Sequence, residues 1–421
     1  MDAIDFLTDR TVLPAAVTAQ ARRCLLDLAG VGWGGSILPL ARIVADHAAE
    51  DLPGPVPLAF DARTAAPMGV ALAAGMTIDA LDGHDGANAT KGHAGCGLIA
   101  GLLAVVPDAM PGAAVLDLLA RGYEVAHRAG VTQHATSPDY HTSGAWVAVA
   151  VAGLAARIAG LDAGAMREAM GIAEYHGPRS QMMRCIDVPT MVKDGSGQGA
   201  MVGVQAAALA ARGFTGAPAR VCDGPAWDDL GTRWMIHEQY FKAYSVCRWA
   251  QAPVEAALSL RTGLDGPIET VTIETFHEAI RLAVTHPTTT EEAQYSTAFP
   301  VAVALARGGI GPRDVSGDTL TDPTVLKVAS RVRFVEDADA NAAFPATRLA
   351  RARIVAGGAE HVSAWHRPRW DADAPPSDAE LAAKFDGMVD GIVAPARANR
   401  LKEMLAGDDW TMADLRAALR P

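Results

Sequence analysis

The sequence predicts a mainly α protein, built from a large all-helical domain and a smaller α+β domain inserted late in the chain. In residues 1–261, alanine and leucine dominate and apolar residues recur at helical spacing. Residues 262–372 contain short alternating segments rich in β-branched residues, which are typical of strands. Residues 373–421 return to helical spacing, and we therefore expect them to complete the helical domain.

Capping residues indicate where helices of the first domain begin and end. Asp162 is suited to begin a helix, because its side-chain oxygen can accept from a free backbone N–H. A helix over residues 199–211 is expected to end at Gly213, since glycine readily adopts the left-handed closing turn. The continuous apolar runs at 97–106 and 145–156 are expected to be buried helices. Each is shorter than the ~18 residues needed to span a bilayer.

The α+β domain shows strand and helix signals in alternation. Its expected strands each have one buried face. They cover residues 268–276, 332–336 and 350–355. Between the first two, Thr289 and Glu292 have capping-box spacing and predict a helix start. Ser377 and Glu380 repeat this spacing where the chain returns to helix.

Composition excludes several classes of protein. Among 421 residues, 48 acidic side chains against 36 Lys and Arg give a net charge of −12, so we expect no nucleic-acid partner. Five scattered cysteines without C-x-x-C spacing argue against a zinc ribbon and a disulfide framework. The opening MDAIDFLTDR is acidic where a secretory signal would be basic and then apolar. We therefore expect a cytoplasmic protein with no membrane partner.

The first polar cluster lies in LDGHDGANATKGHAGCG, which brings together Asp82, His84, Asp85, Lys91 and His93. Glycines let a backbone approach a ligand closely, and loops next to buried helices often carry sites. The same residues are equally consistent with a solvated loop whose acids cap the next helix. The ligand types lack zinc spacing, so we expect no metal here.

Two further clusters precede predicted helices. His141 comes before a long apolar helix, where it is a candidate base, a cap or a hydrogen-bonded core residue. Lys193 is followed by Gly195, Gly197 and Gly199. This arrangement offers a cation and backbone N–H groups to an anionic ligand, or it is a flexible turn with a solvated lysine. It is not a phosphate-binding P-loop, in which the lysine follows the glycines.

The fourth cluster, FKAYSVCRWAQAP, contains Lys242, Cys247 and Arg248. Arg248 could bind a carboxylate through two N–H groups. Cys247 could have a lowered pKa beside Arg248, although a buried structural thiol is the commoner case. Together the four clusters supply cations and histidines that suit a small substrate with several carboxylates.

The order of these clusters resembles the MmgE/PrpD family, which includes 2-methylcitrate dehydratase, cis-aconitate decarboxylase and iminodisuccinate epimerase. The resemblance runs nearly end to end. It is carried by LDGHDG…GHAG, YHTSG before an apolar helix, GVQAAALAARGFTGAP after the lysine–glycine stretch, KAYSVCRWA, EEAQYSTAFPVAVAL and PPSDAELAAKF. It implies a helical domain and an α+β domain, a homodimer, and a site at the domain interface without metal or organic cofactor. The implied chemistry removes a proton next to a carboxylate of a di- or tricarboxylic acid.

The resemblance also implies roles for individual residues. His141 is the expected proton-transfer group, because it matches the histidine that precedes the next long helix. The expected catalytic residues are His141, Lys193, His93 and Asp82. The expected substrate-binding residues are Lys242, Arg248, Cys247 and Asp85. Asp85 is included because the loop before His93 is one residue longer than in the family, so the family's aspartate could correspond to Asp85 and not to Asp82.

Departures from the family pattern bear on the reaction. Gly86 replaces a threonine of the decarboxylase-like members, and Cys247 replaces a histidine. We therefore expect a carbon–oxygen lyase that dehydrates a hydroxylated di- or tricarboxylate. The alternatives are an epimerase of a substituted succinate that uses Lys193 or Cys247 as second acid, a decarboxylase, and a non-catalytic carboxylate binder. Tyr295 is expected to pack in the core, and His277 has no expected place at the site.

Overall fold

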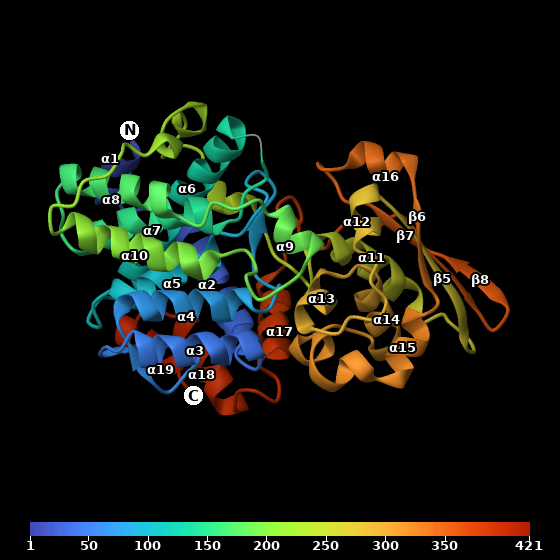
Figure 1. Cartoon of the computed structure of the whole chain (residues 1–421). Coiled ribbons are helices and arrows are strands. Elements are labelled where there is room, and N and C mark those ends of the chain that lie inside the picture. Colours follow the sequence, from blue (N-terminus) through green and yellow to red (C-terminus); the bar gives the residue numbers. More distant parts are fainter. Residues whose placement is uncertain (138) are drawn as a thin grey trace.

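The computed structural model describes residues 1–137 and 139–421, which form a helical lobe and an α+β lobe side by side (Figure 1). The prediction of a mainly α protein with an α+β part is confirmed. The helices of the first lobe are α1 (Ala3–Thr8), α2 (Ala15–Gly35), α3 (Pro39–Asp51), α4 (Pro67–Asp79), α5 (Gly95–Val105), α6 (Gly112–Thr136), α7 (Gly144–Ile158), α8 (Ala163–His176), α9 (Met183–Asp187) and α10 (Ser196–Ala210).

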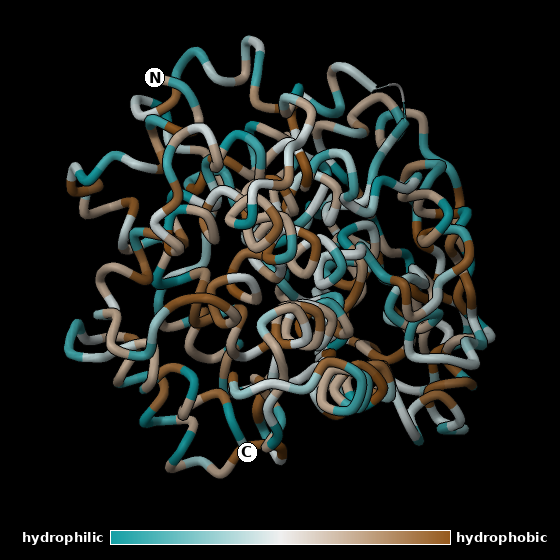
Figure 2. The backbone as a smooth tube through the Cα atoms, turned by 60° about the vertical axis from the view of Figure 1, so that its left-hand side comes forward, coloured by the Kyte–Doolittle hydropathy of each residue, from teal (hydrophilic) through white to brown (hydrophobic). Residues whose placement is uncertain are grey.

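Helix α10 packs against α7 and α4 in the helical lobe. Its glycines make this approach possible: a Cβ on Gly197 would lie 2.5 Å from Met76 Cγ and 2.6 Å from the carbonyl oxygen of Leu72. Figure 2 shows hydrophobic stretches running through the packed helices, whereas many outer loops are hydrophilic. Within the described residues, none of the individual helices combines the length and apolar character required to cross a bilayer.

The α+β lobe is built on a four-stranded sheet in the order β6-β5-β7-β8. Its strands are β5 (Ile268–Thr275), β6 (Val332–Glu336), β7 (Ala350–Ala356) and β8 (Ala359–Val362). Strand β5 is parallel to β6 and antiparallel to β7, which forms a hairpin with β8. The sequence did not predict β8, because it is short and mostly exposed. The turn before it uses Gly357 and Gly358 at positive φ, as tight hairpins require.

The helices of this lobe are α11 (Arg248–Arg261), α12 (His277–Arg281), α13 (Thr290–Tyr295), α14 (Ala298–Arg307), α15 (Pro323–Ala329) and α16 (Ala338–Ala343). Helix α11 packs against α14 and β7, so it lies with the α+β lobe and not with the helical body in which we expected it. Thr289 accepts from the backbone N–H of Glu292 at the start of α13, as its spacing predicts.

The chain then returns to the helical lobe through α17 (Asp378–Val389), α18 (Pro395–Ala406) and α19 (Met412–Ala418). The Ser377–Glu380 capping box forms at the start of α17, and α17 packs along α2. Short strand pairs are β1 (Val56–Pro57) with β2 (Thr64–Ala65) and β3 (Gly86–Ala87) with β4 (Gln239–Tyr240).

A buried ion pair ties α17 to the first polar loop. The ammonium of Lys384 donates to Asp27 on α2 and, at 2.7 Å, to the carbonyl oxygen of Gly83. The side chains of Lys384 and Asp27 are almost fully buried. We predict that Lys384→Met lowers the free energy of unfolding by about 3–5 kcal/mol, because it leaves the carboxylate of Asp27 buried without a partner.

Urea unfolding followed by circular dichroism measures this loss. The matched control is Lys402→Met, whose ion pair with Asp386 is exposed and should contribute about 0–1 kcal/mol. Equal losses in both variants would contradict a special role for the buried pair.

Candidate active site

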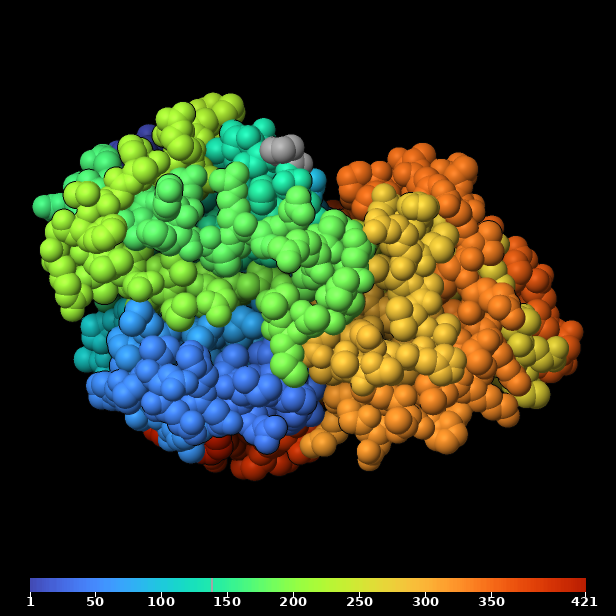
Figure 3. Space-filling view, in the orientation of Figure 1, coloured from blue at the N-terminus to red at the C-terminus, as the bar shows by residue number. Residues whose placement is uncertain are grey.

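A cavity of about 740 Å³ opens where the two lobes meet, along the groove visible in Figure 3. Both lobes contribute polar and aromatic side chains to its wall. From the helical lobe these include Asp79, Asp82, Asn88, Lys91, His93, Tyr140, Asp194, Tyr240 and Lys242. From the α+β lobe they include Cys247, Arg248, Trp249, Tyr295, Phe344 and Arg348.

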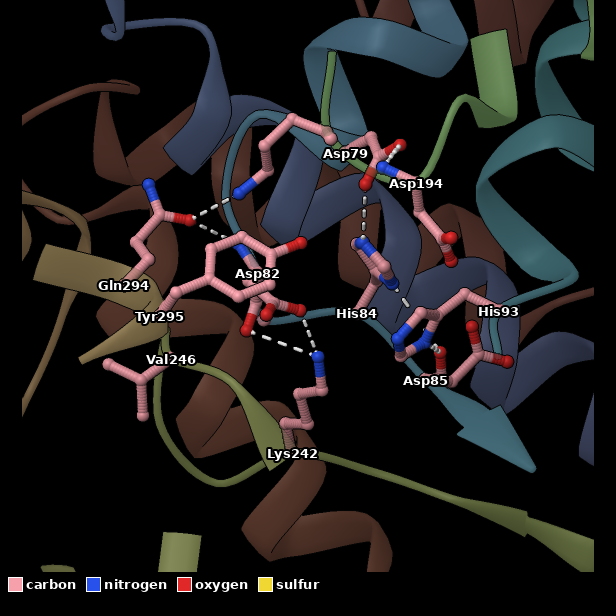
Figure 4. A network of polar contacts seen from close by, with 12 residues as sticks. Asp79, Asp82, His84, Asp85, His93, Asp194, Lys242, Val246, Gln294 and Tyr295 are labelled. Carbon is pink, nitrogen blue, oxygen red and sulfur yellow. Dashed lines mark hydrogen bonds and ion pairs between the residues drawn. The ribbon is translucent and has the colours of Figure 1, made fainter. Parts of the chain in front are cut away.

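The first loop and the Lys242 segment are joined by the β3–β4 pair, in which Gly86 lies opposite Tyr240. This strand pairing places Lys242 beside Asp82, and the ammonium of Lys242 forms an ion pair with the carboxylate of Asp82 (Figure 4). The backbone N–H of Asp82 donates to Gln294 Oε1 at 2.7 Å, which fixes the loop against α13.

Both members of this pair are charged. Burial raises the pKa of Asp82, but the ammonium groups of Lys242 and Lys193 outweigh burial and hold that pKa below its ordinary range. Burial lowers the pKa of Lys242, but Asp82 more than offsets this, and the pKa of Lys242 is raised. The contact with Lys242 therefore favours the ionised form of Asp82, which accepts hydrogen bonds and does not donate them.

The ring of His93 lines the cavity. Its Nδ1 lies 2.6 Å from the backbone oxygen of Asp85, which can only accept, so Nδ1 carries the proton and Nε2 has the lone pair. No residue in the described part of the chain bonds to Nε2. Burial, then Lys242 and His84, lower the pKa of His93 well below its ordinary value, so the ring is neutral at neutral pH.

Asp85 lies behind His93 and does not line the cavity. Its carboxylate accepts from Tyr123 Oη at 2.6 Å. Burial raises the pKa of Asp85 to about 6, although the hydrogen bond from Tyr123 lowers it. The structure therefore places Asp85 as a residue that orients His93 through its backbone oxygen, and not in contact with the space available to a substrate.

Lys193 is buried at the edge of the site. Its backbone is left-handed (φ 49°). Its ammonium donates to Gln294 Oε1 at 2.9 Å and lies 5.0 Å from the centre of the Tyr295 ring. Lys193 thus contacts Gln294 and Tyr295 of α13, and Tyr295 in turn lines the cavity.

The glycine stretch after Lys193 does not offer its N–H groups to a ligand. The backbone N–H groups of Asp194 and Ser196 donate to Asp79 Oδ2, at 3.2 and 3.4 Å. A protein carboxylate therefore occupies the start of α10, and the expectation of an anion site there is wrong. The glycines serve the close packing of α10, as Gly197 shows.

Ser143 connects three of the four clusters. Its hydroxyl donates to Asp194 Oδ2 and accepts from the backbone N–H of His93 at 2.9 Å. Its own backbone N–H donates to Asp194 Oδ1 at 2.9 Å. Burial, and then Asp79, raise the pKa of Asp194. The network fixes the loop of His93 against the starts of α7 and α10.

The structure does not bring His141 to the cavity wall, where the neighbouring Tyr140 lies instead. The ring of His141 is buried and stacks on His134, with centroids 6.0 Å apart. Burial, and then Arg179, lower its pKa. The structure therefore shows no contact of His141 with the cavity, although Ser143, two residues later, bonds to the backbone of His93.

Cys247 and Arg248 both line the cavity. Burial, and then Asp82, raise the pKa of Cys247 to about 11, so the thiol is protonated and the alternative of a lowered pKa is wrong. The guanidinium of Arg248 lies 3.8 Å from the centre of the Tyr240 ring and donates to Asp371 at 2.6 Å.

Sequence reasoning missed Gln294 and Arg348. Tyr295 is buried in a small apolar cluster, as expected, but it also lines the cavity, where its hydroxyl accepts from Cys185 Sγ at 3.5 Å. Gln294 is fully buried and contacts Asp82 and Lys193. Its neighbours in TEEAQYST are mostly polar, so the local sequence did not single it out. His277, in contrast, lies on the surface, paired with Glu336.

Comparison with protein families accounts for nearly the whole chain. The MmgE/PrpD N-terminal domain matches residues 8–243, and the MmgE/PrpD C-terminal domain matches residues 244–409. A search of curated proteins returns no match. The boundary between the two domains falls between Lys242 and Cys247, so each contributes side chains to the cavity. The chain belongs to the MmgE/PrpD family.

Proposed function

We propose that the protein is a carbon–oxygen lyase that dehydrates a hydroxylated di- or tricarboxylic acid, with His93 as the base. Family membership supports a dehydratase-like or related activity. The observation that supports the finer assignment is the neutral His93, whose Nε2 has no partner within the described residues and whose ring lines a cavity that also contains cationic side chains. A neutral imidazole beside bound carboxylates is the arrangement needed to remove an acidic C–H proton.

The proposed reaction begins when Lys242 and Arg248 hold carboxylates of the substrate. His93 Nε2 takes the proton from the carbon next to one carboxylate, and the electron pair of that C–H bond forms the C=C bond. The C–O bond breaks, and the departing hydroxide takes a proton from the imidazolium and leaves as water. The fixed cations stabilise the negative charge that develops on the carboxylate during this step.

Cys247 supports a second candidate function, the epimerisation of a substituted succinate. Its thiol is protonated and lines the same cavity as His93. An epimerase needs such a second acid to return the proton to the opposite face of the carbanion.

We predict that kcat/KM stays high above the pKa of His93 and falls as the pH drops through it. Burial and neighbouring cations lower this pKa, so the acid limb should have its midpoint below the ordinary histidine value of about 6.5. A pH series of initial rates measures the midpoint. An acid limb centred above that value would contradict His93 as the neutral base.

Proton NMR in D₂O distinguishes the candidate reactions. The panel is citrate, 2-methylcitrate, cis-aconitate, malate, tartrate and amino- or imino-substituted succinates. New alkene proton signals that grow as the proton signals of the hydroxylated substrate disappear would support dehydration. Deuterium at the α-carbon without an alkene would favour epimerisation, and loss of carbon would favour decarboxylation. Thermal stabilisation by a ligand without turnover would favour a non-catalytic binder.

A further inference from the structure

Two guanidinium groups in the cavity wall have more N–H groups than protein acceptors. Arg248 is 6% exposed, and its Nε and Nη1 have no acceptor among the residues that the structure describes. Arg348 is 9% exposed, and its Nε is likewise without an acceptor there. Buried polar groups are normally hydrogen-bonded, so these atoms indicate a missing partner.

One carboxylate, that of Asp371, bonds directly to Arg248 and is linked to Arg348 through Asn88. Arg248 Nη2 donates to Asp371 Oδ1 at 2.6 Å. Asn88 joins the second arginine to the same group: its Nδ2 donates to Asp371 Oδ1 at 3.1 Å, and its Oδ1 accepts from Arg348 Nη1 at 3.0 Å. Arg348 has no carboxylate partner of its own among the described residues. Arginine stays protonated in proteins, so an anion bound in the cavity can balance its charge.

The cluster lies beside the proposed reaction centre. The ring of Tyr240 is 3.8 Å from the guanidinium carbon of Arg248, and its centre is 6.3 Å from that of the His93 ring. Arg248 and His93 also line the same cavity, so one small molecule could contact both. The cluster also spans the two lobes, since Asn88 belongs to the helical lobe and Arg348 to the α+β lobe.

We infer that Arg248 and Arg348 form a second carboxylate subsite, held in place by Asn88 and Asp371, and that Arg348 selects substrates with a carboxylate away from the reacting carbon. The inference rests on the proposed function of the cavity. It defines the substrate class more narrowly: one carboxylate next to the C–H bond at His93, and another that reaches the arginines.

Calorimetry with two matched ligands tests the subsite. The probes are propane-1,2,3-tricarboxylate and its terminal monoamide, which has nearly the same shape but one charge fewer. The full-length protein should prefer the tricarboxylate. Arg348→Gln should weaken tricarboxylate binding by about 10- to 100-fold, the usual range for one charged hydrogen bond, and monoamide binding by less than about threefold. Arg348→Lys should retain part of the preference, because it keeps the charge.

Arg353→Gln is the matched control. Arg353 lies on β7 of the same lobe and pairs with Glu360 at the surface, so its replacement should leave both affinities unchanged. If Arg348→Gln weakens both ligands equally, or neither, the subsite is refuted.

If Arg348→Gln does not fold, Asn88→Asp provides the test, because it places a carboxylate between the arginines and should lower tricarboxylate affinity selectively. An unchanged preference in that variant would also refute the subsite. Neither probe has a hydroxyl leaving group, and the calorimetry measures only their affinities. The dehydration proposal is tested by turnover of a substrate, so it can fail independently of the subsite.

Discussion

Replacing His93 with asparagine is expected to lower kcat by roughly 10²- to 10⁴-fold, the usual contribution of a positioned general base. Asparagine can keep a donor to the backbone oxygen of Asp85, the partner that now binds Nδ1 at 2.6 Å, but it has no counterpart of Nε2. The loop should therefore keep its conformation while the proton acceptor is lost. Initial rates on the substrate found by NMR measure the effect, and circular dichroism checks the fold.

His141→Asn is the matched comparison, because His141 is the base that the family resemblance favours. The structure places its ring outside the cavity, stacked on His134, so we expect a loss within about tenfold, well short of a missing base. If the His141 variant loses activity by orders of magnitude and the His93 variant does not, the base is His141 and the proposed assignment is wrong.

Lys242→Met should reduce kcat/KM by roughly 10²- to 10³-fold, because it removes a fixed cation that stabilises charge developing on the substrate. It should also cost about 3–5 kcal/mol of stability, since the carboxylate of Asp82 is left buried without its partner. Burial alone raises the pKa of Asp82, so this carboxyl should become protonated at higher pH than in the wild type. Urea unfolding and steady-state kinetics measure the two effects.

The double variant Asp82→Asn, Lys242→Met separates stability from catalysis. Removing both charges should recover most of the lost stability, because no buried charge is left unpaired. Activity should stay low, because the cation is still missing. If the double variant recovers activity together with stability, Lys242 acts only as a structural partner of Asp82.

Much of the fold could be predicted because its signals are local. Apolar periodicity identified the helical body, and Asp162 and Ser377 cap the helices that they were expected to begin. Alternation identified three strands. Strand β8 was missed because four mostly exposed residues carry no such pattern, and α11 was assigned to the wrong body because its amphipathic face does not specify which lobe it packs against.

The site was predictable only where its residues are polar exceptions in apolar sequence. His93 and Lys242 were found this way, and both line the cavity. Gln294 and Arg348 were missed because their roles depend on partners more than 200 positions away, such as Asp82 and Asn88. The sequence also could not show that Tyr140, and not His141, lines the cavity. Adjacent side chains ahead of a helix point in different directions, and only the packed structure determines which one faces the cavity.

The bond from Lys384 to Gly83 has a consequence for biosynthesis. The two residues are 301 positions apart, yet the bond holds the loop that carries Asp82 and His93. The N-terminal part of a chain leaves the ribosome long before its C-terminal part, so contacts between positions this far apart form late in synthesis and folding. The nascent chain should therefore lack an organised catalytic loop until α17 has emerged, and an isolated fragment that stops before α17 should not acquire one.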